Sequence, residues 1–491
     1  MQSADWHNPP PARRTVYYWL FFLIVISGPW FIARFHSAIS LTDIFLIIVF
    51  LYLLMHRSDA WGFFINARPM WLVGGMFAAS VTYSLAIPLW IGSEISSWRA
   101  AVTISQYGCI FFVFPLLAGA LRSSMTSQTF IRLVALAYLS PLLVQLMYTV
   151  GEACTDCTLQ SDPFFSAGRA LLSYGNANSA AIVISISLPF FLTLFLTETV
   201  RRWRAVGLLG IVTSFSCLLL TGSTSGILCF VGSYVATVLA FLIVKPRRAI
   251  FLRAAVASVL GIAAVIGAIQ FIVHTRSTSD QLRYRMDFAS QQMEPVFLRL
   301  GLLKSGQRPK LSPPAKLEPL STEAPDARIP SANLRLEFMW ESLESVRRHL
   351  YGVYGEGIGQ AQALRGERIT HLAYLLLLEE GGWPLLLSYL ALVASLYRNL
   401  WRSAEPIEYK LCLAVALTSL ALGGVFQTHM YLRFYWIPLL FAFASPRRCR
   451  DAVKHEEAEQ SLRPNFKLAS TSFLANVGSR SDEARSQIVE N

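Results

Sequence analysis

Twelve long apolar runs, separated by short polar segments, restrict the fold of this chain more than any other feature. Each run is close to the roughly 20 residues that a helix needs to cross a bilayer. The runs cover residues 15–33, 38–55, 69–90, 101–121, 130–150, 178–198, 204–221, 226–244, 250–273, 372–397, 408–427 and 430–445. Only 15% of the residues are charged, and the mean hydropathy of +0.46 is well above that of soluble proteins. We therefore predict an all-α, polytopic membrane protein with about 12 transmembrane helices.

The basic residues predict how the helices are oriented in the membrane. The formal net charge is +12, but arginines and lysines occur in short clusters between apolar runs and form no continuous stripe. We therefore expect no nucleic-acid partner. With the N-terminus inside, the predicted cytoplasmic segments contain clusters such as Arg201, Arg202 and Arg204, whereas the short segments on the far side contain few basic residues. This asymmetry places both termini in the cytoplasm.

The same alternation divides the chain into four regions. They are transmembrane helices 1–9 in residues 1–273, a far-side loop in 274–371, transmembrane helices 10–12 in 372–445, and a disordered cytoplasmic tail in 446–491. Within the loop, prolines concentrate between Ser305 and Ser331, which is typical of a mobile linker. Apolar residues then recur at helical spacing from about Asn333 to Leu350. They predict an amphipathic helix that lies on the membrane surface or roofs a cavity.

Residues suited to polar chemistry gather around the start of the tenth predicted helix. In chain order they are Arg335, Trp340, the turn Gly355-Glu356-Gly357-Ile358-Gly359, Arg365, Arg368, His371, Tyr374, Glu380 and Gly382. Two further polar segments precede other predicted helices. The first runs from Arg169 to Tyr174-Gly175-Asn176-Ala177-Asn178, and the second is Leu220-Thr221-Gly222-Ser223-Thr224-Ser225-Gly226.

The order of these motifs resembles the O-antigen ligase and polymerase family of membrane glycosyltransferases. His371, Tyr374 and the Glu380-x-Gly382 pair match that family's spacing at the head of a transmembrane helix. The chain departs from the pattern at Leu372, where the family usually has a polar residue, and at Thr224, which replaces an arginine. The second departure removes one candidate phosphate-binding cation.

The resemblance implies a bacterial inner-membrane enzyme whose active site faces the periplasm, with the 274–371 loop on that side. Such an enzyme moves an oligo- or polysaccharide from undecaprenyl diphosphate to an acceptor hydroxyl. The acceptor is lipid A-core for a ligase and another glycan for a polymerase. Membrane lipids would surround the helices, and no cofactor is expected. The segment from Arg34 to Ser37 has no carboxylate, so the resemblance implies transfer without a metal.

The expected roles follow from side-chain chemistry. Arginine stays charged and binds phosphate oxygens in pairs, so Arg335, Arg365, Arg368 and Arg169 are candidates to hold the diphosphate. His371 is the candidate base or acceptor-positioning group, since imidazole titrates near neutral pH. Candidate substrate contacts are Asn176, Asn178, Ser223, Tyr374 and Glu380. Helix capping explains the two asparagines equally well, and a structural ion pair explains Glu380 equally well.

Other functions remain open from the sequence. Within the family, the chain is a polymerase or a protein O-oligosaccharyltransferase if the acceptor differs. Outside it, a lipid-linked sugar flippase or transporter needs no catalytic residues, although such proteins tend to have repeated halves and none is seen here. Cys154 and Cys157 face the oxidising side in this topology and form a disulfide in one interpretation. The sequence specifies neither the sugars, the acceptor, the linkage nor the oligomeric state.

Overall fold

The computed structural model describes one helical body. The described residues are 11–30, 34–36, 39–56, 68–92, 95–155, 165–166, 169–170, 172, 174, 176–246, 248–274, 331–361, 372–428 and 432–443. At some positions, including Arg169 and Arg335, the description covers the backbone alone. The predicted tail and most of the predicted loop lie outside these residues.

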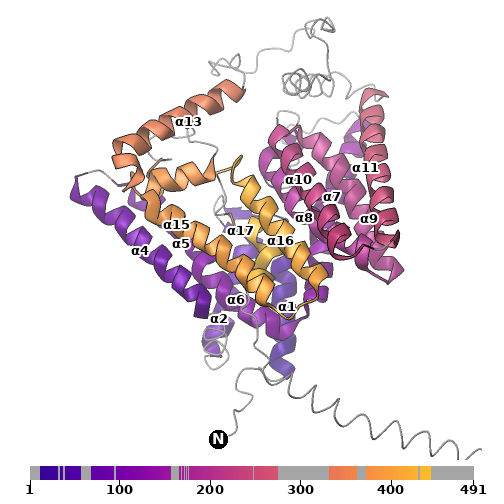
Figure 1. Ribbon diagram of the computed structural model, residues 1–491, viewed down its shortest axis with the longest axis horizontal. Coiled ribbons are helices and arrows are strands. Elements are labelled where there is room, and N and C mark those ends of the chain that lie inside the picture. The colour runs from indigo at the N-terminus through magenta and orange to yellow at the C-terminus, as the bar shows by residue number, and fades with distance from the viewer. Residues whose placement is uncertain are drawn as a thin grey trace, which may run out of the picture. The chain divides into compact units, whose positions relative to one another are not determined.

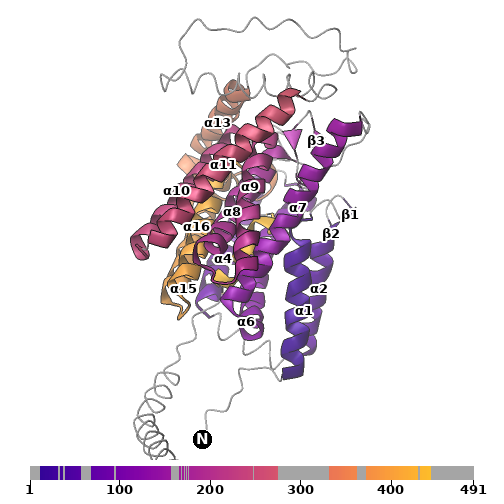
Figure 2. The same cartoon turned by 90° about the vertical axis from the view of Figure 1, so that its right-hand side faces the viewer.

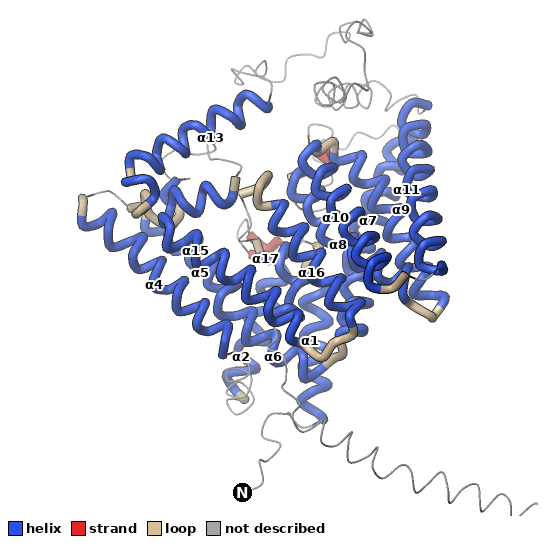
Figure 3. The backbone as a smooth tube through the Cα atoms, in the orientation of Figure 1, coloured by secondary structure: helices blue, strands red, loops and turns tan. Residues whose placement is uncertain are grey.

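Helices make up almost all of the described chain (Figures 1 and 3). They are α1 (Pro11–Ser27), α2 (Leu41–Met55), α4 (Arg68–Trp90), α5 (Ser97–Gly108), α6 (Phe114–Ser124), α7 (Ser127–Thr155), α8 (Ala177–Thr197), α9 (Arg201–Thr221), α10 (Thr224–Val244), α11 (Arg248–His274), α13 (Ser331–Arg348), α15 (Ala373–Arg402), α16 (Ile407–Gly423) and α17 (Arg433–Trp436). A π-helix, η1 (Cys109–Val113), joins α5 to α6, and 3-10 helices η2 (Leu350–Gly352) and η3 (Ile437–Phe443) follow α13 and α17. Two short antiparallel hairpins pair β1 (Arg34–His36) with β2 (Ile39–Ser40) and β3 (Phe165–Ser166) with β4 (Arg169–Ala170).

The structure agrees with a membrane-embedded helical protein. Each of the twelve predicted runs is at least partly helical, and eight spans among the described residues are long and apolar enough to cross a bilayer. The total of twelve transmembrane helices stays a prediction. Two runs differ from their predicted form. The first helix ends at Ser27, before Gly28-Pro29, because a proline disfavours helical geometry in the residue before it. The last run is mainly 3-10 helix around Pro438, which has no backbone N–H to donate.

Helix α8 forms the centre of the bundle. Within its apolar span 94% of the residues are buried, whereas only 28% are buried in the span of α10. Helix α9 approaches α8 closely because Gly207 and Gly210 lack side chains; a Cβ at Gly207 would lie 2.6 Å from the Phe191 carbonyl oxygen. Small residues allow this close approach between membrane helices.

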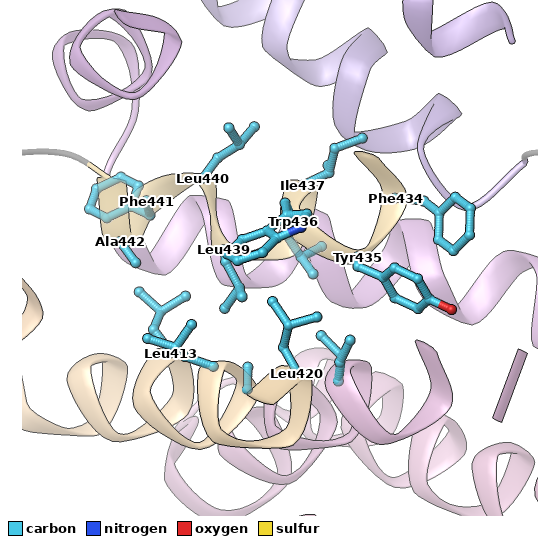
Figure 4. Close-up of a cluster of buried hydrophobic side chains, with 14 of the residues drawn as sticks. Leu413, Leu420, Phe434, Tyr435, Trp436, Ile437, Leu439, Leu440, Phe441 and Ala442 are labelled. Carbon is cyan, nitrogen blue, oxygen red and sulfur yellow. The ribbon is translucent and has the colours of Figure 1, made fainter. Parts of the chain in front are cut away.

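The rest of the body packs around this centre. Helices α1 and α2 lie side by side (Figure 2). The segment formed by α17 and η3 is buried, with Trp436 and Leu439 facing Leu413 and Leu420 of α16 (Figure 4). The short C-terminal segment is therefore part of the core, although only its length and apolar character were predicted.

Contacts between helix termini define two ends of this bundle. At one end, Arg132 at the start of α7 pairs with Glu198 after α8, and Lys245 after α10 pairs with Glu408 at the start of α16. At the other end, the start of α8 contacts the start of α10, and the start of α15 contacts the end of α16. We call these the charged end and the polar end. The grouping matches the predicted alternation, in which the charged end is cytoplasmic.

Candidate functional site

Two helix starts meet at the polar end through their capping residues. Asn176 caps α8, and its Oδ1 accepts hydrogen bonds from the backbone N–H groups of Asn178 at 2.8 Å and Ser179 at 3.4 Å. Ser223 caps α10 by accepting from the Gly226 N–H at 3.1 Å. The Ser223 hydroxyl also donates to Oδ1 of Asn178 at 2.8 Å. Capping therefore brings together the two polar segments that precede these helices in the sequence.

The chain that follows α16 adds a fifth polar residue to this group. The amide Nε2 of Gln427 donates to the Ser179 hydroxyl at 3.1 Å, and Gln427 is only 2% exposed. We call Asn176, Asn178, Ser179, Ser223 and Gln427 the polar cluster. Asn176 is exposed and Asn178 is half-buried, so the cluster extends from the core to the surface of the polar end.

The start of α15 is fixed to the same end of α16. The backbone N–H of Ala373 donates to the Gly424 carbonyl at 2.8 Å, and the Tyr374 hydroxyl donates to the Ala421 carbonyl at 2.7 Å. Tyr374 was predicted to contact substrate, and its observed bond is to α16. The substrate contact stays a prediction.

A sharp bend interrupts α15 beside the glycine-rich turn (Figure 1). Gly382 has φ 68° and ψ −168°, which is essentially accessible to glycine alone. Pro384 has no N–H, so the Glu380 carbonyl has no helical donor four residues later. The turn replaces the missing donors: the Glu356 N–H donates to the Glu379 carbonyl at 2.8 Å, and the Gly357 N–H donates to the Glu380 carbonyl at 2.9 Å.

The glycine-rich turn and the Glu380-x-Gly382 motif are thus one structural unit. A Cβ at Gly355 would lie 2.4 Å from the Glu380 carbonyl oxygen, so only glycine allows this approach. The side chain of Glu380 is buried, and its backbone carbonyl completes the bend. The structure gives Glu380 this backbone role and leaves its predicted substrate contact untested.

The turn is also held by the two neighbouring helices. The Gln360 side chain accepts from the Ser96 N–H at 2.7 Å and donates to the Ser96 carbonyl at 3.3 Å, next to the start of α5. The Tyr83 hydroxyl of α4 donates to the Val353 carbonyl at 3.1 Å. The turn is therefore fixed in place from three helices.

The structure describes only some of the remaining predicted site residues. Arg365, Arg368 and His371 lie outside the described residues. Both flanks of segment 362–371 are described: Ala361 packs against Leu376 of α15, and Leu372 precedes α15 directly. The two residues that flank this segment in the chain therefore both lie near the start of α15.

The two remaining arginines are described by their backbone alone. Arg169 belongs to strand β4, and Arg335 belongs to the first turns of α13. Their predicted contacts with a diphosphate remain predictions.

A carboxylate does lie close to the first segment predicted to be on the far side, although none lies within that segment. Asp43 near the start of α2 forms an ion pair with Arg433 of α17 and accepts from the Ser40 N–H at 2.8 Å and hydroxyl at 2.9 Å. Within the described ranges, no group of three or more His, Cys, Asp or Glu side chains is placed to hold a metal ion. Transfer without a metal and a disulfide at Cys154 both stay predictions; Cys157 lies outside the described residues.

Sequence reasoning missed Gln427 and Gln360. Each is an uncharged amide next to an apolar helix, where a buried polar side chain needs a partner. That rule flags both residues, but it cannot name Ser179 and Ser96 as their partners, which lie far away in sequence.

A small pocket lies at the charged end. It is lined by residues of α6, α15, α16 and η3, among them Arg122, Asn399 and Lys410. No residue predicted to carry function lines it. Comparisons of the chain with protein-family models and with curated proteins find no match.

Proposed function

We propose that this protein transfers an oligo- or polysaccharide from undecaprenyl diphosphate to an acceptor hydroxyl, as an O-antigen ligase with lipid A-core as the acceptor. One observation carries the proposal. Asn178 and Ser223, from two separate motifs, are hydrogen-bonded at the end of the bundle where α15 begins directly after the His371 segment. Motifs that match one family's order along the chain therefore also share one end of the molecule.

The chemistry suits residues at a helix end near a bilayer surface. The bond between the sugar's anomeric carbon and the diphosphate oxygen breaks, and the acceptor oxygen forms the new bond to that carbon. The diphosphate leaves with added negative charge, which the guanidinium groups of Arg335, Arg365, Arg368 and Arg169 would stabilise. His371 would take the proton of the acceptor hydroxyl.

The polar cluster suits the sugar part of the donor. Its exposed and half-buried members, Asn176 and Asn178, carry amide groups that can both donate and accept hydrogen bonds. Sugar hydroxyls need both kinds of partner. The polar cluster is neutral, so the arginines would bind the charged diphosphate of the donor and the cluster would bind its sugar.

The proposal is tested by His371→Ala in the purified protein, reconstituted with a lipid-linked glycan and lipid A-core. Loss of the general base is expected to lower the transfer rate by at least about 100-fold. His56→Ala is the matched control, because His56 follows α2 and bonds the Tyr52 carbonyl of its own helix. Wild-type transfer by the His371 variant would remove this residue from the mechanism.

A gel of surface lipopolysaccharide from a deletion strain identifies the acceptor. Loss of all O-chain, with polymer retained on the carrier lipid, is expected for a ligase. A single remaining repeat would indicate a polymerase, and absence of outward-facing precursor would indicate a flippase. An unchanged gel would indicate exopolysaccharide or protein acceptors.

A further inference from the structure

The chain after α13 combines strained backbone with exposed apolar side chains. Leu350, Tyr351 and Gly352 adopt left-handed conformations in succession, with φ of 53°, 57° and 82°. Residues with side chains rarely adopt this geometry. Leu350 is 62% exposed, Tyr351 71% and Val353 51%. The left-handed backbone is unfavourable in any surroundings, and the exposed apolar side chains add a further cost where they face water.

Hydrogen bonds place this segment beside membrane-spanning helices. The indole N–H of Trp383 in α15 donates to the Tyr351 carbonyl at 3.1 Å, and the Tyr83 hydroxyl of α4 donates to the Val353 carbonyl at 3.1 Å. Tyr83 precedes the end of α4 at Trp90 by about two helical turns, or roughly 10 Å. The segment therefore lies alongside the apolar part of α4 (Figure 1).

The exposed side chains continue a surface that faces lipid. Trp383, Leu387 and Leu390 recur at helical spacing on one side of α15, and all three are exposed within a candidate membrane span. The bond from Trp383 to Tyr351 joins the strained segment directly to this stripe. The apolar surface of α15 thus extends onto the chain that follows α13.

Helix α13 itself carries charge on its exposed face. Glu344 and Arg348 form an exposed ion pair one turn apart at 2.6 Å, and Arg347 is exposed beside them. Trp340 and Leu343 of α13 are exposed as well, at 66% and 38%, and the change to exposed residues that are all apolar comes at Leu350. Such a change is typical of a chain that crosses from water into a bilayer interface.

We propose that Leu350, Tyr351 and Val353 form a lipid-inserted wedge that contacts the acyl chains of the leaflet at the polar end. Burial in lipid removes the apolar surface from water and offsets the left-handed backbone. The wedge sets the height of the glycine-rich turn, because Val353 lies two residues before Gly355 and is bonded to α4. The inference is independent of whether the protein transfers sugars.

Site-specific photo-cross-linking tests the wedge in the full-length protein. p-Benzoylphenylalanine replaces Tyr351, Leu390 or Arg348, one at a time, and each protein is reconstituted in vesicles of phosphatidylethanolamine and phosphatidylglycerol. Mass spectrometry after irradiation then detects added phospholipid. Leu390 is the lipid-facing reference on α15, and Arg348 is the water-facing reference on α13.

The expected result is phospholipid attached at position 351 in a yield that approaches that at 390, with none at 348. Absence of adducts at 351 in a protein that still cross-links lipid at 390 would overturn the proposal. Cross-links from 351 to another part of the chain would also overturn it, as would cross-links to a second copy. Because the reference at 390 reports a folded, inserted protein, a folding defect is distinguished from a water-exposed segment.

Discussion

Two groups of contacts, one at each end of the bundle, hold the helices together by different forces. At the charged end, Arg132 and Glu198 form a two-bond ion pair at 2.8 and 2.9 Å, with Trp203 packed on the guanidinium. At the polar end, the cluster around Asn178 and Ser223 uses neutral hydrogen bonds between amides, hydroxyls and backbone groups. Charges that pair with each other stabilise an end without offering it to a ligand. The polar cluster itself has no charged member, which leaves room for an anionic substrate to bring its own charge; the Asp43–Arg433 ion pair at the same end joins α2 to α17 separately from this cluster.

At the polar end, we expect the largest decrease in unfolding free energy from loss of the bend in α15. Gly382→Ala places a Cβ 2.7 Å from the Gly352 carbonyl oxygen in a backbone region closed to alanine. We expect a loss of about 3 kcal/mol in unfolding free energy. Thermal unfolding in detergent measures it.

Gly75→Ala is the control for that substitution. Gly75 lies in α4, and a Cβ there meets nothing within 4 Å. Alanine in a helix is favoured over glycine, so this variant is expected to be as stable as the parent or slightly more so. Equal melting temperatures for both variants would show that the bend is not needed.

The Arg132–Glu198 pair is the matching target at the charged end. Arg132→Met leaves Glu198 buried without its main cation, and we expect a loss of about 2 kcal/mol in unfolding free energy, below the roughly 3–5 kcal/mol for buried pairs because Arg132 is partly exposed. Adding Glu198→Leu is expected to recover most of the loss. Transfer per folded molecule should be unchanged in both variants. A large loss of transfer would contradict a purely structural role for this end.

The helices and their alternation could be predicted because bilayer thickness fixes the length of an apolar run. The bend could not be predicted, since the α15 run contains Gly382 and Pro384 but the partner that replaces the lost hydrogen bonds lies at Glu356 and Gly357. Such a partner depends on tertiary packing. The resemblance in spacing identified both the glycine-rich turn and the Glu380-x-Gly382 pair. It gave no reason why the two occur together.

The candidate site was predictable to a similar extent. Asn176, Asn178 and Ser223 were identified as residues before helices, and capping, which was the alternative considered for the asparagines, is what joins them. Gln427 was missed because nothing in an apolar run indicates which distant hydroxyl a glutamine will meet. Residue type and position predict a cap, whereas the partner across the bundle follows from helix packing.

Ser223→Ala tests whether the polar cluster does more than cap a helix. The variant loses the bond to the Gly226 N–H and the bond to Asn178, which predicts a loss of about 1 kcal/mol. Transfer is expected to fall further than this small change in stability explains. Ser105→Ala is the control, because Ser105 is exposed and bonds only the Val102 carbonyl of its own helix. Equal transfer by the two variants would leave Ser223 with a capping role alone.

The smallest expected effect concerns the water-facing side of α13. The hydrogen bond and positive charge of Arg348 hold the pKa of Glu344 below its ordinary value of 4.5. This pairing therefore stabilises α13 above pH 4.5, and the contribution is lost as pH falls through the lowered pKa of Glu344. Glu344→Gln removes the pair at every pH, so the variant's amide exchange in α13 should exceed the parent's at pH 6 and converge with it near pH 3. The difference is expected to be slight because both side chains are exposed and salt screens them. A difference that persists at pH 3 would show that Glu344 acts on α13 by some means other than its charge. The contrast between a charged, water-facing surface on α13 and an apolar wedge after it would then be wrong.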